Sequence, residues 1–406
     1  MPRWLLFVIF FGVAGTLLGG VHFYLYRRLV VSPALPAPWS TVVRVALIVL
    51  AVSIPLSFVV IRLVSNEAAK YLVYPVYVWM GLMLMFFFVL LGLDLVRGLA
   101  WSVTRATGHA DLLADPERRL ILARAMAGAA AGTVFTAATI GLAHGLGKVA
   151  VKRVEVTLAH LPLELDGFTL VQLTDLHLGP MRHGDWVAEV VRRVNELKPD
   201  LVAITGDLVD GTVAQLADDV APLKSLEAPQ GVYFVTGNHE YFSDLTGWLK
   251  HLPSIGLRVL RNERVTIRRG GPGGPCFDLA GVDDHEGRRF APGHGADIPK
   301  AMRGADPNRA VVLLAHQPKA VLEACRHNVG LVLSGHTHGG QIWPWRYLVY
   351  LQQPYVDGLH NHKGTQIYVS DGTGFWGPPM RLGSTAEITH VTLRSRAAPR
   401  SRSTVG

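Results

Sequence analysis

Four long apolar stretches in the first third of the chain limit most strongly what it can fold into. These uncharged stretches cover residues 4–26, 45–61, 71–93 and 125–147. A helix needs about 20 apolar residues to cross a ~30 Å hydrocarbon core, so the first, third and fourth stretches are long enough to span a membrane. The second is shorter and contains Pro55, but it can span if Arg44 and Arg62 extend their charges toward the headgroups. The sequence therefore predicts an all-α transmembrane bundle of four helices within residues 1–148.

The distribution of charge and of histidine places a boundary near Lys148. Residues 1–148 hold 12 Lys/Arg, 5 Asp/Glu and 3 His, whereas residues 149–406 hold 27, 26 and 14. The net charge is therefore +7 before the boundary and +1 after it. The apolar stretches also explain why only 17% of all residues are charged, compared with about 25% in soluble domains. We expect a second domain over residues 149–395 and a basic disordered tail over residues 396–406.

The apolar stretches predict a multi-pass protein of the cell membrane, but they leave its orientation open. Four spans would place the N-terminus and the second domain on the same side of the membrane. Six basic residues flank the spans on each side, so the positive-inside rule gives no decision between the two orientations. A cleaved signal peptide is the alternative interpretation of the first stretch, although its apolar region would be unusually long.

The second part of the chain alternates strands and helices, and polar residues follow the strands. Short Val/Ile/Leu runs, typical of strands buried on both faces, cover residues 169–173, 201–204, 232–235, 310–314 and 331–333. Helical spacing of apolar residues covers 185–197 and 214–226. Ligand sites in open α/β sheets collect beyond the carboxyl ends of the strands. The polar residues after these five runs therefore indicate one shared site.

The polar residues at these strand ends are oxygen and imidazole donors. They are Asp175, His177, Asp207, Asn238, His316, His336 and His338. A donor set without thiolate suits Mn, Fe or Zn in a catalytic site and argues against a structural Cys-rich zinc site. Seven donors exceed the three or four protein ligands that one ion needs, so we expect two metal ions. Two ions about 3.5–4 Å apart can hold the attacking and the leaving oxygens of a displacement at phosphorus, and they lower the pKa of bound water.

Single residues of this set also have ordinary structural explanations. His316 could be a loop or capping residue, Asn238 a turn residue with positive φ, and Asp210 the N-cap of the following helix. Three glycines precede donors, and we expect each to let the backbone turn tightly at a strand end. They are Gly206, Gly237 and Gly335.

Five short motifs contain the donors in a fixed order along the chain. They are Asp-x-His at 175–177, Gly-Asp-x-x-Asp at 206–210, Gly-Asn-His-Glu at 237–240, a single histidine at 316, and Gly-His-x-His at 335–338. In this order they resemble the calcineurin-like metallophosphoesterases, and the resemblance covers about residues 150–395. The runs at 335–341, 281–284 and 379–381 are similar to the bacterial membrane-associated branch of that family. The resemblance implies an α/β sandwich of two mixed sheets flanked by helices.

The resemblance also implies a role for each residue of the site. The metal ligands would be Asp175, His177 and His338 at the first ion, Asn238, His316 and His336 at the second, and Asp207 between the two. A bridging or terminal hydroxide would attack the phosphorus. His239 would lie beside the phosphate and help to protonate or stabilise the leaving oxygen, and Asp210 would orient it.

Eight further histidines and the two cysteines have no motif support. The histidines, which we expect at the surface or in packing, are His183, His251, His285, His294, His327, His360, His362 and His390. Cys276 and Cys325 stand in no metal-binding spacing, and both a disulfide and a pair of free thiols remain open.

Two segments outside the motifs allow two interpretations each. Residues 261–274 mix arginine with glycine, which predicts an edge strand with a loose hairpin tip, or else a patch that binds phosphate or lipid headgroups. Aromatic residues surround the last motif, either as core packing or at a membrane interface or substrate groove. These residues are Trp343, Trp345, Tyr347, Tyr350, Tyr355, Phe375 and Trp376.

Three functions follow from these patterns, and they belong to different classes. The leading one is a membrane-anchored dinuclear-metal phosphoesterase that cleaves a phosphomonoester, phosphodiester or pyrophosphate bond, with membrane lipids as neighbours and a lipid-linked phosphate as the favoured substrate. A nuclease or nucleotide phosphodiesterase is the second, but no nucleic-acid partner is expected because the second domain is nearly neutral. The third is a membrane sensor with a non-catalytic phosphoesterase-like domain, which the complete ligand set disfavours.

Overall fold

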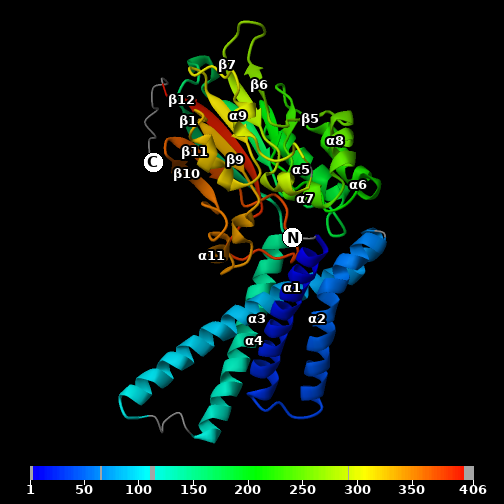
Figure 1. Cartoon of the computed structure of the whole chain (residues 1–406), viewed down its shortest axis with the longest axis vertical. Helices are drawn as coiled ribbons and strands as arrows, with labels where there is room; N and C mark the ends of the chain where they lie inside the picture. The colour runs from blue at the N-terminus through cyan, green and yellow to red at the C-terminus, as the bar shows by residue number, and fades with distance from the viewer. Residues whose placement is uncertain (1–2, 65, 110–114, 291, 397–406) are drawn as a thin grey trace. The chain divides into compact units, whose positions relative to one another are not determined.

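The structure is a computed structural model that describes residues 3–64, 66–109, 115–290 and 292–396. The chain forms two compact units, Met1–Ala143 with Gly377–Met380, and His144–Trp376 with Arg381–Gly406. The predicted tail at 396–406 lies outside the described residues except for Arg396. Figure 1 shows both units and labels most of their helices and strands.

The first unit consists of long helices. They are α1 (Arg3–Tyr26), continued by a π-helical turn (Arg27–Val31), α2 (Trp39–Leu63), α3 (Asn66–Ala106) and α4 (Pro116–Leu146). Among the described residues, three helical segments are long and apolar enough to cross a membrane, namely Trp39–Ile61, Ala68–Ala106 and Pro116–Leu146. The predicted spans at 45–61 and 71–93 lie within the first two segments, and the span predicted at 125–147 ends one residue beyond the third. The span predicted at 4–26 falls in α1, several of whose first side chains lie outside the described residues, so the count of four stays a prediction.

The helices extend beyond the uncharged stretches because charged residues do not end an α-helix. Backbone hydrogen bonding continues through Arg97 and Arg105 in α3 and through Arg118 and Arg119 in α4, and arginine has a high helix propensity. An ion pair between Arg28 and Asp94 connects the π-helical turn to α3, and the Tyr24 hydroxyl donates to the same carboxylate at 2.6 Å. The uncharged stretches therefore locate the apolar part of each helix rather than its ends.

The second unit contains two six-stranded mixed sheets (Figure 1). The first sheet has the order β1 (Ala150–Leu158), β12 (Glu387–Ser395), β2 (Phe168–Leu173), β3 (Leu201–Ile204), β4 (Val232–Phe234) and β5 (Leu257–Val259). The second has the order β10 (Gly358–His362), β11 (Thr365–Val369), β9 (Leu331–Ser334), β8 (Val311–Leu314), β7 (Cys276–Gly281) and β6 (Glu263–Arg268). Strands β2 to β5 run parallel in the first sheet, as do β7, β8, β9 and β11 in the second.

The two sheets pack face to face, and helices cover their outer faces. One buried apolar cluster joins side chains of both sheets, including Phe168 and Phe277, whose ring centroids lie 5.1 Å apart. The outer face of the first sheet packs against α5 (Gly184–Glu196), α6 (Val213–Val220) and α8 (Leu245–Ser254). The outer face of the second packs against α9 (Ile298–Ala301) and α10 (Val321–Ala324). The predicted sandwich of two mixed sheets flanked by helices is therefore confirmed.

The predicted strands match β2, β3, β4, β8 and β9 to within one residue at each end. The helix predicted at 214–226 is wrong in its second half, where α6 ends at Val220 and a 3-10 turn covers Ala221–Ser225. Pro222 explains the difference, because it has no backbone N–H to donate to the carbonyl four residues earlier.

The segment at 261–274 forms the edge strand β6 and a hairpin to β7, as predicted. Gly270, Gly271 and Gly273 have positive φ at the hairpin tip. Its arginines mostly have acidic partners. Arg261 pairs with Asp283, Arg264 with Asp278 and Arg269 with Asp200. These ion pairs favour a structural role over a patch that binds anions.

The structure also decides between the two alternatives for the cysteines. Both Cys276 and Cys325 are free thiols.

Candidate metal centre

The seven predicted donors lie together at the carboxyl ends of five strands. Asp175 and His177 follow β2, Asp207 follows β3, Asn238 follows β4, His316 follows β8, and His336 and His338 follow β9. The two sheets meet at this edge, where the side-chain amide of Gln172 donates to the Ser334 carbonyl at 3.0 Å. Ligands that are 163 residues apart along the chain thereby reach one site.

The first cluster consists of Asp175, His177 and His338, all buried, with ligand atoms within 4.8 Å of one another. The Nε2 atoms of His177 and His338 are 3.1 Å apart, and His338 Nε2 lies 3.4 Å from Asp175 Oδ1. The backbone N–H of His336 donates to Asp175 at 3.0 Å, which joins the ends of β2 and β9.

The second cluster consists of Asp207, His316 and His336. His316 Nε2 lies 3.0 Å from Asp207 Oδ2 and 3.2 Å from His336 Nδ1. Asn238 Oδ1 is buried and has no hydrogen-bond partner among the described residues. Asp207 Oδ2 is also 3.8 Å from His177 Nε2 of the first cluster, so this carboxylate lies between the two groups.

The chemistry of the donors fits cations. His316 Nδ1 lies 2.7 Å from the Thr205 carbonyl and donates to it, which turns the other ring nitrogen toward Asp207 and His336. Burial and the neighbouring His316 lower the pKa of His336 to about 3, and burial and His177 lower that of His338 well below 6.5, so both rings offer free lone pairs. The unprotonated rings of His336 and His338 thus lie beside the carboxylates of Asp207 and Asp175 in a buried space. Positive charge between these donors would offset the electrostatic repulsion between them, and divalent metal ions bind such N/O donor sets.

His239 and Asp210 lie beside the clusters and form the predicted pair. His239 Nδ1 is 2.6 Å from Asp210 Oδ1. Burial alone would lower the pKa of His239, but Asp207 and Asp210 raise it to about 9. Asp210 Oδ1 also lies 3.1 Å from His177 Nδ1. One carboxylate therefore orients both a predicted metal ligand and the predicted proton donor, a double role that the motif does not indicate.

The backbone of the site is strained at the ligands themselves. Five predicted ligands have positive φ: Asp175 (53°), His177 (49°), Asp207 (51°), His336 (70°) and His338 (52°). Each left-handed non-glycine residue costs about 1–2 kcal/mol and persists only where the surrounding structure enforces it. Such strain clusters at functional sites, so it supports a functional role for these loops.

The glycines before the ligands have two different roles. Gly206 has a φ of 85°, which confirms its predicted tight turn. The prediction was wrong for Gly237, whose φ is −100°, and for Gly335, which also lacks a positive φ. A Cβ atom at Gly237 would collide with Asp207 Oδ1, and one at Gly335 would collide with Asp175 Oδ2. These two positions need glycine because ligand carboxylates occupy the space of a side chain.

Glu240, the last residue of Gly-Asn-His-Glu, was missing from the predicted site. Its buried carboxylate accepts hydrogen bonds from the backbone N–H groups of Gly237 (2.6 Å), Asp207 (3.1 Å) and Leu208 (2.7 Å). Burial and the neighbouring Asp207 raise its pKa to about 7. Glu240 thus fixes the loop after β3 to the loop after β4. Its position in the Gly-Asn-His-Glu motif is the sequence feature from which this role could have been predicted.

Two further buried side chains support the ligands from the runs at 379–381 and 281–284. Arg381 donates to the carbonyls of Asp371 (2.7 Å) and Gly372 (3.2 Å), beside His338. Asp284 accepts two hydrogen bonds from the Gln317 amide, at 3.1 and 3.0 Å, next to His316. The eight histidines without motif support belong to none of the possible metal clusters among the described residues.

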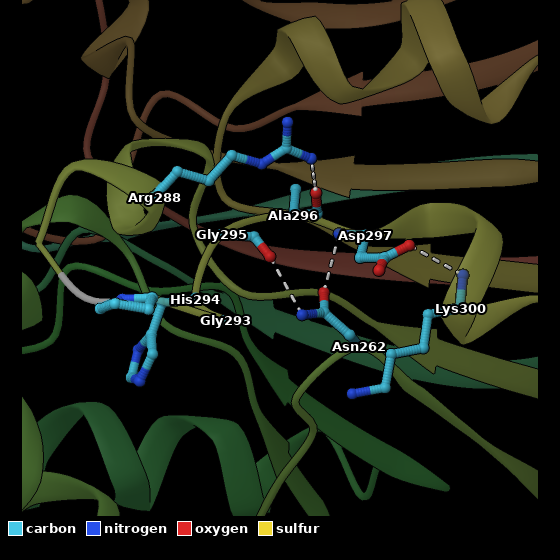
Figure 2. A pocket seen from close by; sticks show the side chains of 9 residues that line it. Asn262, Arg288, Gly293, His294, Gly295, Ala296, Asp297 and Lys300 are labelled. Atoms are coloured by element: carbon cyan, nitrogen blue, oxygen red, sulfur yellow. Dashed lines mark hydrogen bonds between the residues drawn. The ribbon is translucent and has the colours of Figure 1, made fainter.

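A cavity of about 350 Å³ lies outside these clusters (Figure 2). Asn262 forms its wall, donating to the Gly295 carbonyl at 3.0 Å and accepting from the Asp297 N–H at 2.9 Å. Arg288, His294 and Lys300 also line it. The cavity contains none of the predicted metal ligands. Its hydrogen bonds fix the loop that follows the 3-10 turn His285–Arg289.

Asp371 gives a pH-dependent prediction for stability. Burial and the nearby Glu387 raise its pKa to about 6 from 3.8. Because the folded-state pKa is raised, the folded protein favours the neutral carboxyl group. The free energy of unfolding is therefore undiminished below about pH 4 and falls as pH rises through 6. Above that pH it is lower by roughly 3 kcal/mol. Asp371→Asn should therefore raise the melting temperature of the full-length protein by several degrees at pH 7.5 and by much less at pH 4.5. Equal effects at both pH values would contradict this, and Asp306→Asn at an exposed position is the matched control.

Comparisons with known proteins agree with the motifs. Residues 168–340 match the calcineurin-like phosphoesterase family. A bovine (Bos taurus) "transmembrane protein with metallophosphoesterase domain" is 42% identical over 78% of this chain and 72% of its own length. A relative of the same name from Danio rerio is 41% identical over 63% of this chain and 60% of its own length. An "uncharacterized metallophosphoesterase" of Bacillus subtilis is 32% identical over 68% of this chain and 98% of its own length.

Among solved structures, the NAD nucleotidase of Haemophilus influenzae aligns with a TM-score of 0.35 and 18% identity, over 55% of this chain and 49% of that one. The family match and the length covered in the bovine and Bacillus relatives decide the assignment. The chain belongs to the calcineurin-like metallophosphoesterases.

Proposed function

We propose that this protein is a membrane-anchored phosphoesterase that hydrolyses a phosphomonoester, phosphodiester or pyrophosphate bond with two bound metal ions, Mn, Fe or Zn. The observation that carries the proposal is the position of Asp207, whose Oδ2 lies 3.0 Å from His316 Nε2 and 3.8 Å from His177 Nε2. A carboxylate between two groups of neutral or acidic donors is suited to hold two cations close together.

The two clusters of side chains support the assignment of ligands that the family resemblance implies. Asp175, His177 and His338 would hold one ion, and Asn238, His316 and His336 the other. Two bound cations supply water of lowered pKa and neutralise negative charge on the phosphoryl oxygens. The Asp210 carboxylate, 2.6 Å from His239 Nδ1, favours the protonated imidazole, so His239 can donate a proton to the leaving oxygen.

The proposed substrate carries a lipid-linked phosphate. Within the described part of the chain, three helical segments are long and apolar enough to span a membrane, and β1 begins at Ala150, only a few residues after α4 ends at Leu146. The short connection ties the phosphoesterase domain to a membrane-spanning helix, which favours a multi-pass protein of the cell membrane. A nuclease is the second candidate, but the net charge of the domain, +1, is less favourable for binding nucleic acid than a strongly basic domain would be.

The proposal is tested on the full-length protein in detergent. Hydrolysis of a bis-aryl phosphate should require added Mn and should disappear with a chelator. Lipid extracts should then be hydrolysed and single-stranded DNA should not. Absence of Mn-dependent hydrolysis of a bis-aryl phosphate, of an aryl monophosphate and of pyrophosphate would leave the non-catalytic sensor as the remaining interpretation, and preference for DNA would favour the nuclease.

A further inference from the structure

Three exposed aromatic side chains adjoin His239. Phe242, Phe290 and Trp376 are 52%, 47% and 45% exposed. The rings of Phe242 and Trp376 lie 5.4 and 5.8 Å from the His239 ring, and Phe290 lies 5.5 Å from Phe242. We call these three residues the aromatic cluster.

The His239 ring contacts both the metal centre and the aromatic cluster. The contact with the metal centre is to the ring of His177, a predicted metal ligand, at 4.5 Å. His239 is thus flanked by a ligand and by the aromatic cluster. A group that leaves the phosphorus and takes a proton from His239 is therefore released beside these rings.

The cluster is assembled from three separate segments and is held in place. Phe242 ends α7 (Asn238–Phe242), the helix that contains His239 itself. The Trp376 backbone is fixed by Gln341, whose side-chain oxygen accepts from the Trp376 N–H at 3.0 Å and whose amide donates to the Trp376 carbonyl at 2.9 Å. Phe290 follows the 3-10 turn at 285–289 and contacts Tyr241 at 5.7 Å. Exposed apolar surface costs free energy, and rings fixed at a reaction site are typical of a binding surface.

We infer that the aromatic cluster binds the hydrocarbon part of the leaving group, so the substrate is a phosphoester of an amphiphilic alcohol. This inference rests on the proposed phosphoesterase function. The three side chains offer apolar area and one indole N–H, which suits an alkyl chain better than a sugar or a nucleobase with many polar groups. The few residues between α4 and β1 keep the phosphoesterase domain attached to a helix that is long and apolar enough to span a membrane, where amphiphilic alcohols are abundant.

The test uses short n-alkyl phosphate esters, from two to eight carbons, below their micelle-forming concentrations. These esters are either monoesters or diesters, according to which class the full-length protein hydrolyses with Mn. Full burial of one methylene is worth about 0.8 kcal/mol, or about fourfold, so kcat/KM should rise about two- to fourfold per carbon. In the triple variant Phe242→Ser, Phe290→Ser, Trp376→Ser this dependence on chain length should fall to near onefold.

Two further variants keep the result interpretable. Phe290→Ser alone changes the ring farthest from His239 and should lower the dependence on chain length without removing it. Leu163→Ser is the matched control, because this exposed leucine precedes β2, at the end of that strand remote from Asp175, and it should keep the full dependence.

The outcomes distinguish the proposed phosphoesterase function from the proposed hydrocarbon site. No hydrolysis of any ester would refute the proposed function itself. Hydrolysis at a rate independent of chain length, or equal chain-length dependence in the wild type and in Phe290→Ser, would overturn the aromatic cluster as a hydrocarbon site. A nucleotide substrate preferred over the octyl ester, with that preference lost in the triple variant, would also overturn it in favour of base stacking.

Discussion

Asp207→Asn is expected to lower the Mn-dependent hydrolysis of a bis-aryl phosphate by at least about 1,000-fold. Loss of one preorganised charge-stabilising group typically costs about 10²–10³ in rate, and Asp207 serves both proposed ions. Asparagine has nearly the same shape, so the loop after β3 should keep its hydrogen bond from the His239 N–H to the side-chain oxygen, which is 2.9 Å in the wild type. The measurement is kcat/KM at saturating Mn.

A matched substitution separates the loss of the bridging carboxylate from a nonspecific effect of an Asp→Asn change on the fold. Asp306→Asn changes an exposed aspartate that pairs with Arg309, so hydrolysis should stay at the wild-type rate. Asp207→Asn activity within tenfold of wild type would contradict the assignment of the bridging carboxylate.

His239→Gln is expected to lower hydrolysis by about 10²–10⁴ for substrates with poor leaving groups, the usual contribution of general acid catalysis. An alkoxide needs a proton in order to leave, whereas a 4-nitrophenolate leaves readily without one. The defect should therefore be much smaller for a 4-nitrophenyl ester than for an alkyl ester of the same class. Asp210→Asn should lower the hydrolysis of both esters, because Asp210 lies 2.6 Å from His239 and also 3.1 Å from the predicted metal ligand His177.

The dependence on the leaving group distinguishes proton donation from a merely structural role. Loss of structure would reduce the hydrolysis of both esters equally. An equal loss for alkyl and 4-nitrophenyl esters would therefore contradict the role of His239 as a proton donor. His251→Gln, on α8, is a control that should change neither rate.

Much of this architecture was predictable because it depends on local patterns. Buried parallel strands give continuous apolar runs, so β2, β3 and β8 could be located from the sequence. Parallel strands place their carboxyl ends at one edge, which is why Asp175 and Asp207 could be assigned to one site.

Other features depend on long-range contacts and leave no local signal. The need for glycine at 237 comes from the Asp207 carboxylate, and the positive φ of His336 accompanies a hydrogen bond from its N–H to Asp175, 161 residues away. The aromatic cluster joins Phe242, Phe290 and Trp376 from segments far apart in the chain. Helix ends in the first unit were also missed, since an uncharged stretch marks apolar length and not the extent of backbone hydrogen bonding.

The most direct test of the account is to count the Mn bound per chain while hydrolysis is followed on the same sample. Full-length protein is stripped with a chelator and Mn is then added back in steps. We predict that activity rises until about two Mn ions are bound per chain, and that Asp207→Asn binds fewer and stays inactive. Full activity in the stripped protein, or activity that is complete with one bound ion, would contradict the two-metal centre.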